Sequence, residues 1–390
     1  MTDAAAPGRD WAAWADDLSV RLADRAQAAE ALRRLPDATL DEVSAAGFFS
    51  LLTPPAVGGE GAGFSLFMDV SRRLAQGCAS SAWTLSFLAL HAWILCKFSP
   101  ELQAELFAGG AVPLAPAPLA PTGQAEKVEG GYRIGGRWEW ATGVNHADWV
   151  IVNCVEAGAM GPRFCVLPLA EVTVEDVWRT AGMAATGSNT IVAKDLFVPE
   201  HRTVPALLLK FAPSPGEAIH PGTTVNYPMS ATLGLVAATP ALGAAEGALR
   251  AFTDRMKIKL QAYSGAKQGE LPITHLRLGE AIATVRAARL VWEDALRQLE
   301  RDGPLGHQIP LETLLALRLA SADIVRLANQ AVNSLAAAAG ASSGFLNAPL
   351  QRHLRDLQMM RGHVMFDWDR TAQIAGKIAL GQEPAASDLL

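Results

Sequence analysis

Residues 131–155 read GYRIGGRWEWATGVNHADWVIVNCV, a stretch dense in aromatic and β-branched residues in which glycines mark the turns. This composition predicts short strands of a sheet rather than helices. Similar runs, RFCVLPL and TIVAKDLFVP, follow at residues 163–169 and 190–199. We therefore predict a small β domain in the middle of the chain, over residues 116–222.

The sequence before this stretch has helical character and predicts an N-terminal helical domain over residues 1–115. Its longest apolar run, SAWTLSFLALHAWILCKF at residues 81–98, approaches the length of a membrane span but contains His91 and several small polar residues. We therefore interpret it as a core helix. The run GAVPLAPAPLAPTG at residues 110–123 is rich in proline, which cannot continue a helix, and predicts the crossover to the β domain.

Residues 223–390 are predicted to form a C-terminal domain of long helices. One apolar stripe steps by threes and fours, as one face of a helix requires, through Leu278, Ile282, Val285, Trp292, Leu296 and Leu299. Two further helices are predicted from about Leu311 to a stop at Gly340 and from about Leu350 to Leu380. Long helices with repeated apolar positions predict a four-helix bundle.

Composition and motifs exclude several classes of function. The 390-residue chain has a formal net charge of -6 and no basic run, so nucleic acid is not an expected partner. The N-terminus lacks the cationic and apolar segments of a secretory signal, which predicts a cytoplasmic protein without a membrane partner. The four cysteines and the histidines lack metal-ligand spacing, so no metal site is predicted. No GxGxxG or Walker sequence is present, which argues against nicotinamide binding to this chain.

Four strings in this order carry a family resemblance: GCASSAW (residues 77–83), GRWEWATGVNHADWVIV (136–152), GMAATGSNTIVAKDLFVPEHR (182–202) and PLQRHLRDLQMMRGHVMFDWD (349–369). Together they resemble the acyl-CoA dehydrogenase superfamily, in its branch of flavin-dependent two-component monooxygenases, the group D hydroxylases. The resemblance covers nearly the whole chain. It implies a mostly α fold with a central β-barrel or sandwich domain between the helical domains.

The resemblance also implies an activity. Such an oxygenase component takes FMNH2 or FADH2 from a separate NAD(P)H-dependent flavin reductase and uses O2, through a flavin C4a-hydroperoxide, to hydroxylate a small substrate. We expect an aromatic substrate, phenol- or indole-like, and a homotetramer. The sequence does not decide between FMN and FAD. N- or S-oxygenation of an amine, an amino sugar or a thiophene remains an alternative within the same branch.

Two further alternatives lie outside monooxygenation. An acyl-CoA dehydrogenase needs a carboxylate that removes the proton α to the thioester. Many members of that branch have a glutamate two residues before the proline that precedes the arginine-rich helix, but this chain has Asn347 there. An amide cannot act as the base, although some dehydrogenases carry the base on another helix. The second alternative is a non-catalytic scaffold, against which the two histidines on apolar segments argue.

These histidines, His91 in LALHAWIL and His363 in MMRGHVMF, are the candidate catalytic residues. We expect both on apolar helical faces. By the resemblance both lie near the flavin ring, where each would hold the oxygen that reacts or the substrate hydroxyl and move a proton. Without the resemblance, a core histidine bonded to a backbone carbonyl would explain either residue. His363 matches the family's C-terminal histidine more closely.

The candidate cofactor-binding residues, from the resemblance, come from the sheet and from the last helices. In WEWATG, Trp140 would cover the flavin ring and Thr142 would reach its polar edge; a strand with one buried aromatic residue is the structural alternative. In ATGSNT, Ser188 would bind flavin N5 or the phosphate side, although an ordinary turn would explain these residues equally well. Arg352 would contact the cofactor, or form a structural salt bridge with Asp356. The complete set is Trp140, Thr142, Thr186, Gly187, Ser188 and Arg352.

Overall fold

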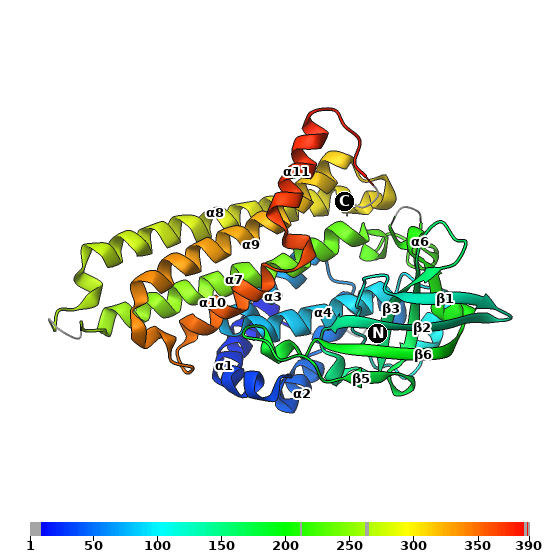
Figure 1. Cartoon of the computed structure of the whole chain (residues 1–390), viewed down its shortest axis with the longest axis horizontal. Coiled ribbons are helices and arrows are strands. Elements are labelled where there is room, and N and C mark those ends of the chain that lie inside the picture. The colour runs from blue at the N-terminus through cyan, green and yellow to red at the C-terminus, as the bar shows by residue number, and fades with distance from the viewer. Residues whose placement is uncertain (1–8, 211–212, 262–264, 386–387, 389–390) are drawn as a thin grey trace, which may run out of the picture.

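The computed structural model describes residues 9–385 and 388, apart from 211–212 and 262–264. The long C-terminal helices run along the longest axis of the molecule, the sheet lies at one end, and the N-terminal helices lie against both (Figure 1). The predicted boundary at residues 115–116 falls between the last N-terminal helix and the first strand, and that at 222–223 falls just before the bundle. The predicted order of helices, sheet and helices is confirmed.

The N-terminal part is helical, and its central helix is a core element. In α4 every residue except Phe87 is buried, which explains why the run at residues 81–98 is apolar around its whole circumference. Helices α3 and α4 both contact α7 of the bundle, so this part shares one hydrophobic core with the C-terminal helices. The helices are α1 (Trp11–Leu32), α2 (Asp37–Ala46), α3 (Phe64–Gly77), α4 (Ala79–Leu95) and α5 (Pro100–Phe107).

The middle of the chain forms one sheet of seven strands in the order β5-β6-β2-β1-β3-β4-β7. Only β1 and β3 pair in parallel; the other neighbours are antiparallel. β4 and β6 contact each other although three strands separate them in the order, so the sheet curves back on itself around a second core that includes Trp138 and Val152. The strands are β1 (Gly123–Val128), β2 (Gly131–Ala141), β3 (Trp149–Glu156), β4 (Arg163–Pro168), β5 (Thr173–Glu175), β6 (Asn189–Pro199) and β7 (Thr203–Pro205).

The C-terminal part is the predicted bundle of long helices. After the short α6 (Ala206–Lys210) it contains α7 (Met229–Ile258), α8 (Pro272–Asp302), α9 (Leu311–Ala339), α10 (Pro349–Met360) and α11 (Trp368–Ala379). α9 ends where predicted, at Gly340, whose φ of 72° favours glycine. Among the described residues one helix, α7, is long and apolar enough to cross a membrane, but 89% of its most apolar window is buried in the protein, as in a core helix.

The predicted single helix from Leu350 to Leu380 is wrong, because α10 ends at Met360 and α11 begins at Trp368. Between them, Val364–Phe366 form a 3₁₀ turn. Two side chains stabilise this break: His363 accepts a hydrogen bond from the backbone N–H of Met365, and Asp367 accepts one from that of Arg370. Such caps favour new helix starts over a continuous helix.

Glycines let α1, α3 and α7 approach closely. A Cβ atom on Gly77 of α3 would lie 1.9 Å from the carbonyl oxygen of Ser19 in α1. A Cβ atom on Gly243 of α7 would lie 2.1 Å from the carbonyl oxygen of Arg72 in α3. Since both obstacles are backbone atoms, neither contact can be relieved by a side-chain movement, and these residues fix the distance between the N-terminal helices and the bundle.

The variant Gly243→Ala is therefore expected to lower the free energy of unfolding by about 1–3 kcal/mol, because the added methyl group forces α3 and α7 apart. The control is Gly279→Ala on the exposed face of α8, where nothing lies within 4 Å of the added atom. That variant is expected to gain up to about 1 kcal/mol, because alanine loses less backbone entropy in a helix. Denaturant unfolding measures both changes, and equal changes in the two variants would contradict the packing argument.

Candidate functional site

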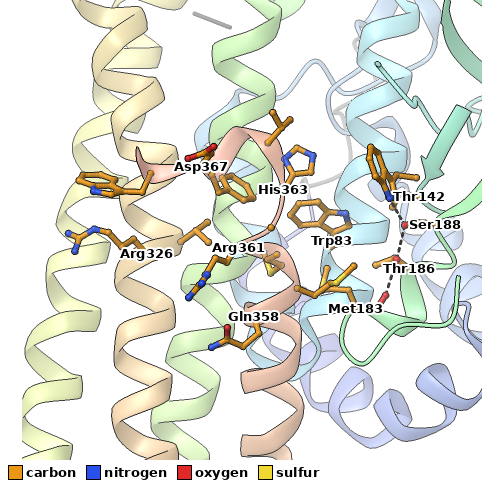
Figure 2. A pocket seen from close by; sticks show the side chains of 18 of the residues that line it. Trp83, Thr142, Met183, Thr186, Ser188, Arg326, Gln358, Arg361, His363 and Asp367 are labelled. Carbon is orange, nitrogen blue, oxygen red and sulfur yellow. Dashed lines mark hydrogen bonds between the residues drawn. The ribbon is translucent and has the colours of Figure 1, made fainter. Parts of the chain in front are cut away.

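A cavity of about 1030 Å³ lies where α4, the sheet and the bundle meet. In Figure 2, His363 and Trp83 lie between Thr142, Thr186 and Ser188 on one side and Arg326 and Arg361 on the other. The sheet side supplies hydroxyl groups and the bundle side supplies charged groups. The lining residues are Trp83, Trp140, Thr142, Trp178, Met183, Thr186, Ser188, Val325, Arg326, Gln358, Met359, Met360, Arg361, Gly362, His363, Val364, Phe366, Asp367, Trp368 and Asp369.

The inner wall of the cavity is aromatic. The ring of Trp83 stacks on Phe87 with centroids 4.5 Å apart and meets Phe366 edge to face at 6.3 Å. From the loop before β6, Trp178 donates a hydrogen bond from its indole nitrogen to the carbonyl oxygen of Met183 at 3.0 Å. Rings held in this way form a preorganised apolar wall for a flat molecule.

Three predicted residues, Thr142, Thr186 and Ser188, come together as one chain of hydroxyl groups. Ser188 Oγ lies 2.9 Å from Thr142 Oγ1 and 2.7 Å from Thr186 Oγ1, and Thr186 Oγ1 donates to the carbonyl oxygen of Met183 at 2.9 Å. Because Thr186 uses its proton on Met183, Ser188 donates to Thr186 and Thr142 donates to Ser188. All three protons are therefore committed, and the cluster offers oxygen lone pairs to the cavity.

The turn that carries Thr186 and Ser188 is held from the bundle. Met183 and Gly187 have φ values of 54° and 53°, and a Cβ atom on Gly187 would lie 2.8 Å from the carbonyl oxygen of Arg33. The backbone N–H of Met183 donates to Asp356 of α10 at 2.6 Å. Gly187 itself does not line the cavity, so its predicted role is limited here to allowing the turn.

Substitution of Asp356 by asparagine is expected to remove one source of pH dependence in stability. Burial raises the pKa of this carboxyl from its ordinary value to about 6. The folded protein therefore binds this proton more tightly than the unfolded chain does. The resulting stabilisation is complete below the unfolded pKa near 4 and is lost as the pH rises through about 6; it amounts to about 3 kcal/mol at most.

The test compares the unfolding free energy of the wild type with that of Asp356→Asn at pH values below 5 and above 7. We expect the wild type to exceed the variant by more at the lower pH. Asp41→Asn, at an exposed position of α2, is the matched control. A difference between wild type and Asp356→Asn that does not change with pH would contradict the assignment.

Trp140 lies on an irregular part of β2, where the register with β6 shifts between Trp138 and Ala141. Its φ of 66° is rare for a bulky residue, and the residue is 61% exposed at the edge of the cavity. The bulge turns this ring out of the sheet toward the space that a ligand would fill. This position fits the predicted covering role better than the alternative of a buried strand residue.

His363 lines the cavity, but not on an apolar helical face as predicted, because it lies in the turn between α10 and α11. Its Nδ1 atom accepts the Met365 N–H at 3.3 Å. The neutral ring therefore carries its proton on Nε2, which leaves a hydrogen-bond donor for the cavity. Burial and then the nearby Arg318 lower the pKa of His363 to about 4, so the ring is neutral at pH 7.

His91 does not line the cavity, and the expectation that both histidines meet there is not supported. It lies two turns beyond Trp83 on α4, about 12 Å along the helix axis, and the ring of Phe87 lies between them, 5.4 Å from His91. Nδ1 donates to the carbonyl oxygen of Ala115 at 2.8 Å, and Nε2 is buried without a partner among the described residues. Burial lowers the pKa of His91 to about 4. Its geometry matches the core-histidine alternative, with one nitrogen left unbonded.

Arg352 is also absent from the cavity lining. It is buried in α10 with its Nε atom unpartnered among the described residues, and the hydrogen bonds of Asp356 go to Met183 and Ser80 instead. The described residues therefore show no salt bridge between Arg352 and Asp356, and the cofactor contact of Arg352 stays a prediction. Sequence reasoning missed Trp83, Trp178, Met183 and Phe366. Trp83, Met183 and Phe366 lie within strings that carry the resemblance, but nothing in the local sequence distinguishes them from core residues.

The lining residues fit a flavin. The cavity is at the upper end of the usual volume range for small-molecule sites, about 300–1000 Å³, so it has room for a large planar group. Aromatic side chains suit the faces of a ring system, and the hydroxyl chain offers acceptors that suit ring N–H groups, which a reduced flavin carries in greater number than an oxidised one. Arg326 and Arg361 at the opposite side can meet an anionic group. Asn347 is exposed and outside the lining, which agrees with the absence of a dehydrogenase base there.

Comparison with known families agrees with this geometry. Residues 14–110 match the N-terminal domain of acyl-CoA dehydrogenase, and residues 235–368 match its C-terminal domain. The chain is 33% identical over 363 residues to a pigment production hydroxylase of a Rhodococcus species, covering 92% of this chain and 93% of the relative. It is 32% identical over 373 residues to the oxygenase component of p-hydroxyphenylacetate 3-hydroxylase of Acinetobacter baumannii, covering 93% and 87% of the two chains.

Solved structures give the same result. The HsaA monooxygenase from Mycobacterium tuberculosis superposes with a TM-score of 0.91 at 30% identity, covering 99% of this chain and 100% of that one. XiaF from a Streptomyces species, in complex with FADH2 and glycerol, superposes with a TM-score of 0.88 at 28% identity, covering 97% and 98%. The chain therefore belongs to the acyl-CoA dehydrogenase family, in the branch of flavin-dependent monooxygenases, and is the oxygenase component of an enzyme that uses reduced flavin and O2.

Proposed function

We propose that this oxygenase hydroxylates a small aromatic compound, phenol- or indole-like, in the cavity beside Trp83 and His363. The observation that carries the proposal is the position of His363: its ring lines the cavity edge to face with Trp83, and its Nδ1 accepts the Met365 N–H, so a neutral imidazole would have Nε2 as a donor. Such a site suits a flat aromatic molecule: the hydroxyl oxygen of a phenol can accept a hydrogen bond from Nε2, whereas an indole, whose N–H only donates, would be held by the aromatic wall. The relative from Acinetobacter baumannii is named for the hydroxylation of p-hydroxyphenylacetate, which is a phenol.

Each group at the site has a separate task in this proposal. Reduced flavin, when bound, would supply the two electrons that activate O2, of which one oxygen atom enters the substrate and the other leaves as water. Trp140 would cover the ring, and Thr142 and Ser188 would accept hydrogen bonds from its polar edge. His363 holds a proton on Nε2 and donates a hydrogen bond from that atom to the reacting oxygen or the substrate hydroxyl. The aromatic wall excludes water, which strengthens this bond.

The reduced flavin is supplied by a second protein. The related chain from Acinetobacter baumannii is named as the oxygenase component, which implies a separate partner component. We propose that this partner is an NAD(P)H-dependent flavin reductase. We also propose a cytoplasmic homotetramer, for which the exposed apolar residues of α8, namely Ile273, Leu276, Ile282 and Leu290, offer a surface.

The test supplies the protein with chemically reduced FMN or FAD, ¹⁸O2 and one of four compounds: p-hydroxyphenylacetate, resorcinol, indole and dibenzothiophene. We expect ¹⁸O in a ring-hydroxylated product of a phenol or of indole, and a transient absorbance before oxidised flavin appears. Oxygen transfer only to the sulfur of dibenzothiophene would replace aromatic hydroxylation by S-oxygenation. Release of hydrogen peroxide alone with every compound, at the rate of free flavin oxidation, would contradict the proposal.

A further inference from the structure

Arg318 of α9 is a buried charge that lies against the turn after His363. The residue is only 2% exposed. Its Nη1 atom donates to the carbonyl oxygen of Met365 at 2.5 Å and contacts Met365 Sδ at 3.2 Å, and its Nη2 atom donates to the carbonyl oxygen of Val364 at 3.2 Å. These acceptors are uncharged, and Nε is buried without a partner among the described residues. Burial of a guanidinium in such surroundings is costly, and an apolar residue could fill the same space at lower cost.

The contacts connect Arg318 to His363 through one peptide group. The carbonyl oxygen of Val364 and the N–H of Met365 belong to the same peptide bond. Arg318 Nη2 donates to that oxygen, and that N–H donates to His363 Nδ1. A cationic donor on the oxygen of a peptide polarises it and makes its N–H a stronger donor. The strengthened N–H then favours the ring form whose Nδ1 is unprotonated.

We propose that Arg318 is a positioning residue for the oxygenation reaction: it fixes the turn after His363 and keeps the imidazole neutral, with its proton on Nε2 toward the cavity. The inference rests on the role proposed above for His363. Two effects act in the same direction. Protonation of Nδ1 would break its hydrogen bond to Met365 N–H, and it would place a second positive charge near Arg318.

The other charged groups near this turn act on the pKa of Arg318 and do not take over its contact with the turn. Asp367 and Arg370, on either side of the start of α11, act on Arg318 in opposite directions: Arg370 lowers and Asp367 raises its pKa. Burial is the largest cause, and it lowers the pKa of Arg318 to about 10, so the guanidinium remains charged at pH 7. Arg318 is the charged group that acts on His363 most directly.

A purely structural role would have different consequences. The Met365 side chain also holds the turn, because its Cε atom packs against Gly234 of α7, where an added Cβ would lie 3.0 Å away. The turn is therefore anchored from α7 as well as from α9, so the loss of Arg318 leaves one anchor in place, and circular dichroism of each variant checks that it folds. If Arg318 served only as an anchor, its loss would change stability but not the proton distribution on His363.

The first measurement uses the wild type alone. Histidine labelled with ¹⁵N reports whether Nδ1 or Nε2 carries the proton, and His363→Gln identifies the signals of His363. We expect an unprotonated Nδ1 and a protonated Nε2 at pH 7, with a titration midpoint well below that of an exposed histidine. A proton on Nδ1 in the wild type would overturn the inference whatever the variants show.

The second measurement compares Arg318→Met and Arg318→Lys with Arg297→Gln, an exposed arginine of α8, as the control. We expect Arg318→Met to raise the titration midpoint of His363 by at least about 1 pH unit and to populate the Nδ1-protonated form. Arg318→Lys keeps the charge but cannot donate from two nitrogen atoms. Its His363 titration midpoint should therefore lie between those of the wild type and Arg318→Met. An unchanged His363 spectrum in folded Arg318→Met would overturn the inference.

Activity separates this inference from the proposed function. Changed His363 spectra together with undiminished hydroxylation by Arg318→Met would show that Arg318 controls the proton on His363, but would contradict the proposed role of His363 and with it any effect of Arg318 on the reaction. Lost hydroxylation with an unchanged His363 spectrum would contradict the positioning role alone. In the expected result Arg318→Met changes both the His363 spectrum and the hydroxylation activity, and Arg318→Lys shows a smaller change in each.

Discussion

The variant His363→Asn is expected to lower kcat for hydroxylation about 100- to 1000-fold, which is the usual effect of removing one well-aimed donor from a dry site. Asparagine is a good N-cap, so its side chain can still accept the Met365 N–H that His363 Nδ1 accepts now. The turn is retained, while the donor at the position of Nε2 is lost. The free energy of unfolding should therefore change by less than about 1 kcal/mol.

The matched variant is His363→Gln, whose longer side chain can place an N–H near the position of Nε2 but does not reproduce the cap. We expect it to retain more activity than His363→Asn while losing more stability. Product formation with saturating reduced flavin, together with the yield of hydrogen peroxide, measures the effect. If His363→Asn and His363→Gln lower kcat equally and by less than about tenfold, His363 does not supply a hydrogen-bond donor to the reaction.

The variant Glu246→Ala is expected to lower the free energy of unfolding by about 3–5 kcal/mol, because it leaves a buried charge without its main partner. Glu246 lies on α7, and its carboxylate binds Arg72 of α3 and Arg289 of α8, each at 2.5 Å, and Gln76 of α3 at 2.8 Å. The Arg72 side chain is only 5% exposed. One carboxylate thus joins three helices across the junction of the N-terminal part and the bundle.

The control for this prediction is Asp294→Ala, which breaks a surface ion pair with Arg297 on α8 and is expected to cost less than about 1 kcal/mol. Denaturant unfolding followed by circular dichroism compares the two variants with the wild type. If Glu246→Ala lowered the free energy of unfolding as little as Asp294→Ala, the prediction would be wrong. The ion pair of Arg72 with Asp69, at 2.6 Å, would then be enough to stabilise the buried charge.

Local sequence patterns predicted the parts of the fold that depend on periodicity and turn chemistry. The β-rich stretch at residues 131–155, the apolar core helix at 81–98 and the end of α9 at Gly340 all follow from side-chain types at regular spacing. The break between α10 and α11 was not predicted from the periodic pattern, because it is stabilised by the caps at His363 and Asp367 and by Arg318, which is distant in sequence and binds the carbonyl oxygens of the turn. A periodic pattern contains no information on such a contact.

The candidate site was predicted in part for a similar reason. Thr142 and Ser188 could be named because their strings resembled those of a family, and they lie within hydrogen-bond distance. His91 was placed at the cavity on the same basis, but it lies two turns beyond Trp83 on α4, with Phe87 between them, and Trp83 lines the cavity instead. Trp178 could not be named, because its indole is aimed by a loop whose shape depends on Asn189, which binds two successive backbone N–H groups.

The cavity takes its walls from all three parts of the chain, and this has a consequence for folding. Trp83 comes from an N-terminal helix, Thr142 from the sheet and Arg326 from the bundle, so no part forms the cavity by itself. A ligand that binds only the assembled form shifts the equilibrium toward it, by about 2.7 kcal/mol at a concentration 100 times its Kd. Bound cofactor should therefore make the three parts unfold together in one transition. Without cofactor, we expect unfolding to be less cooperative and to begin at the cavity.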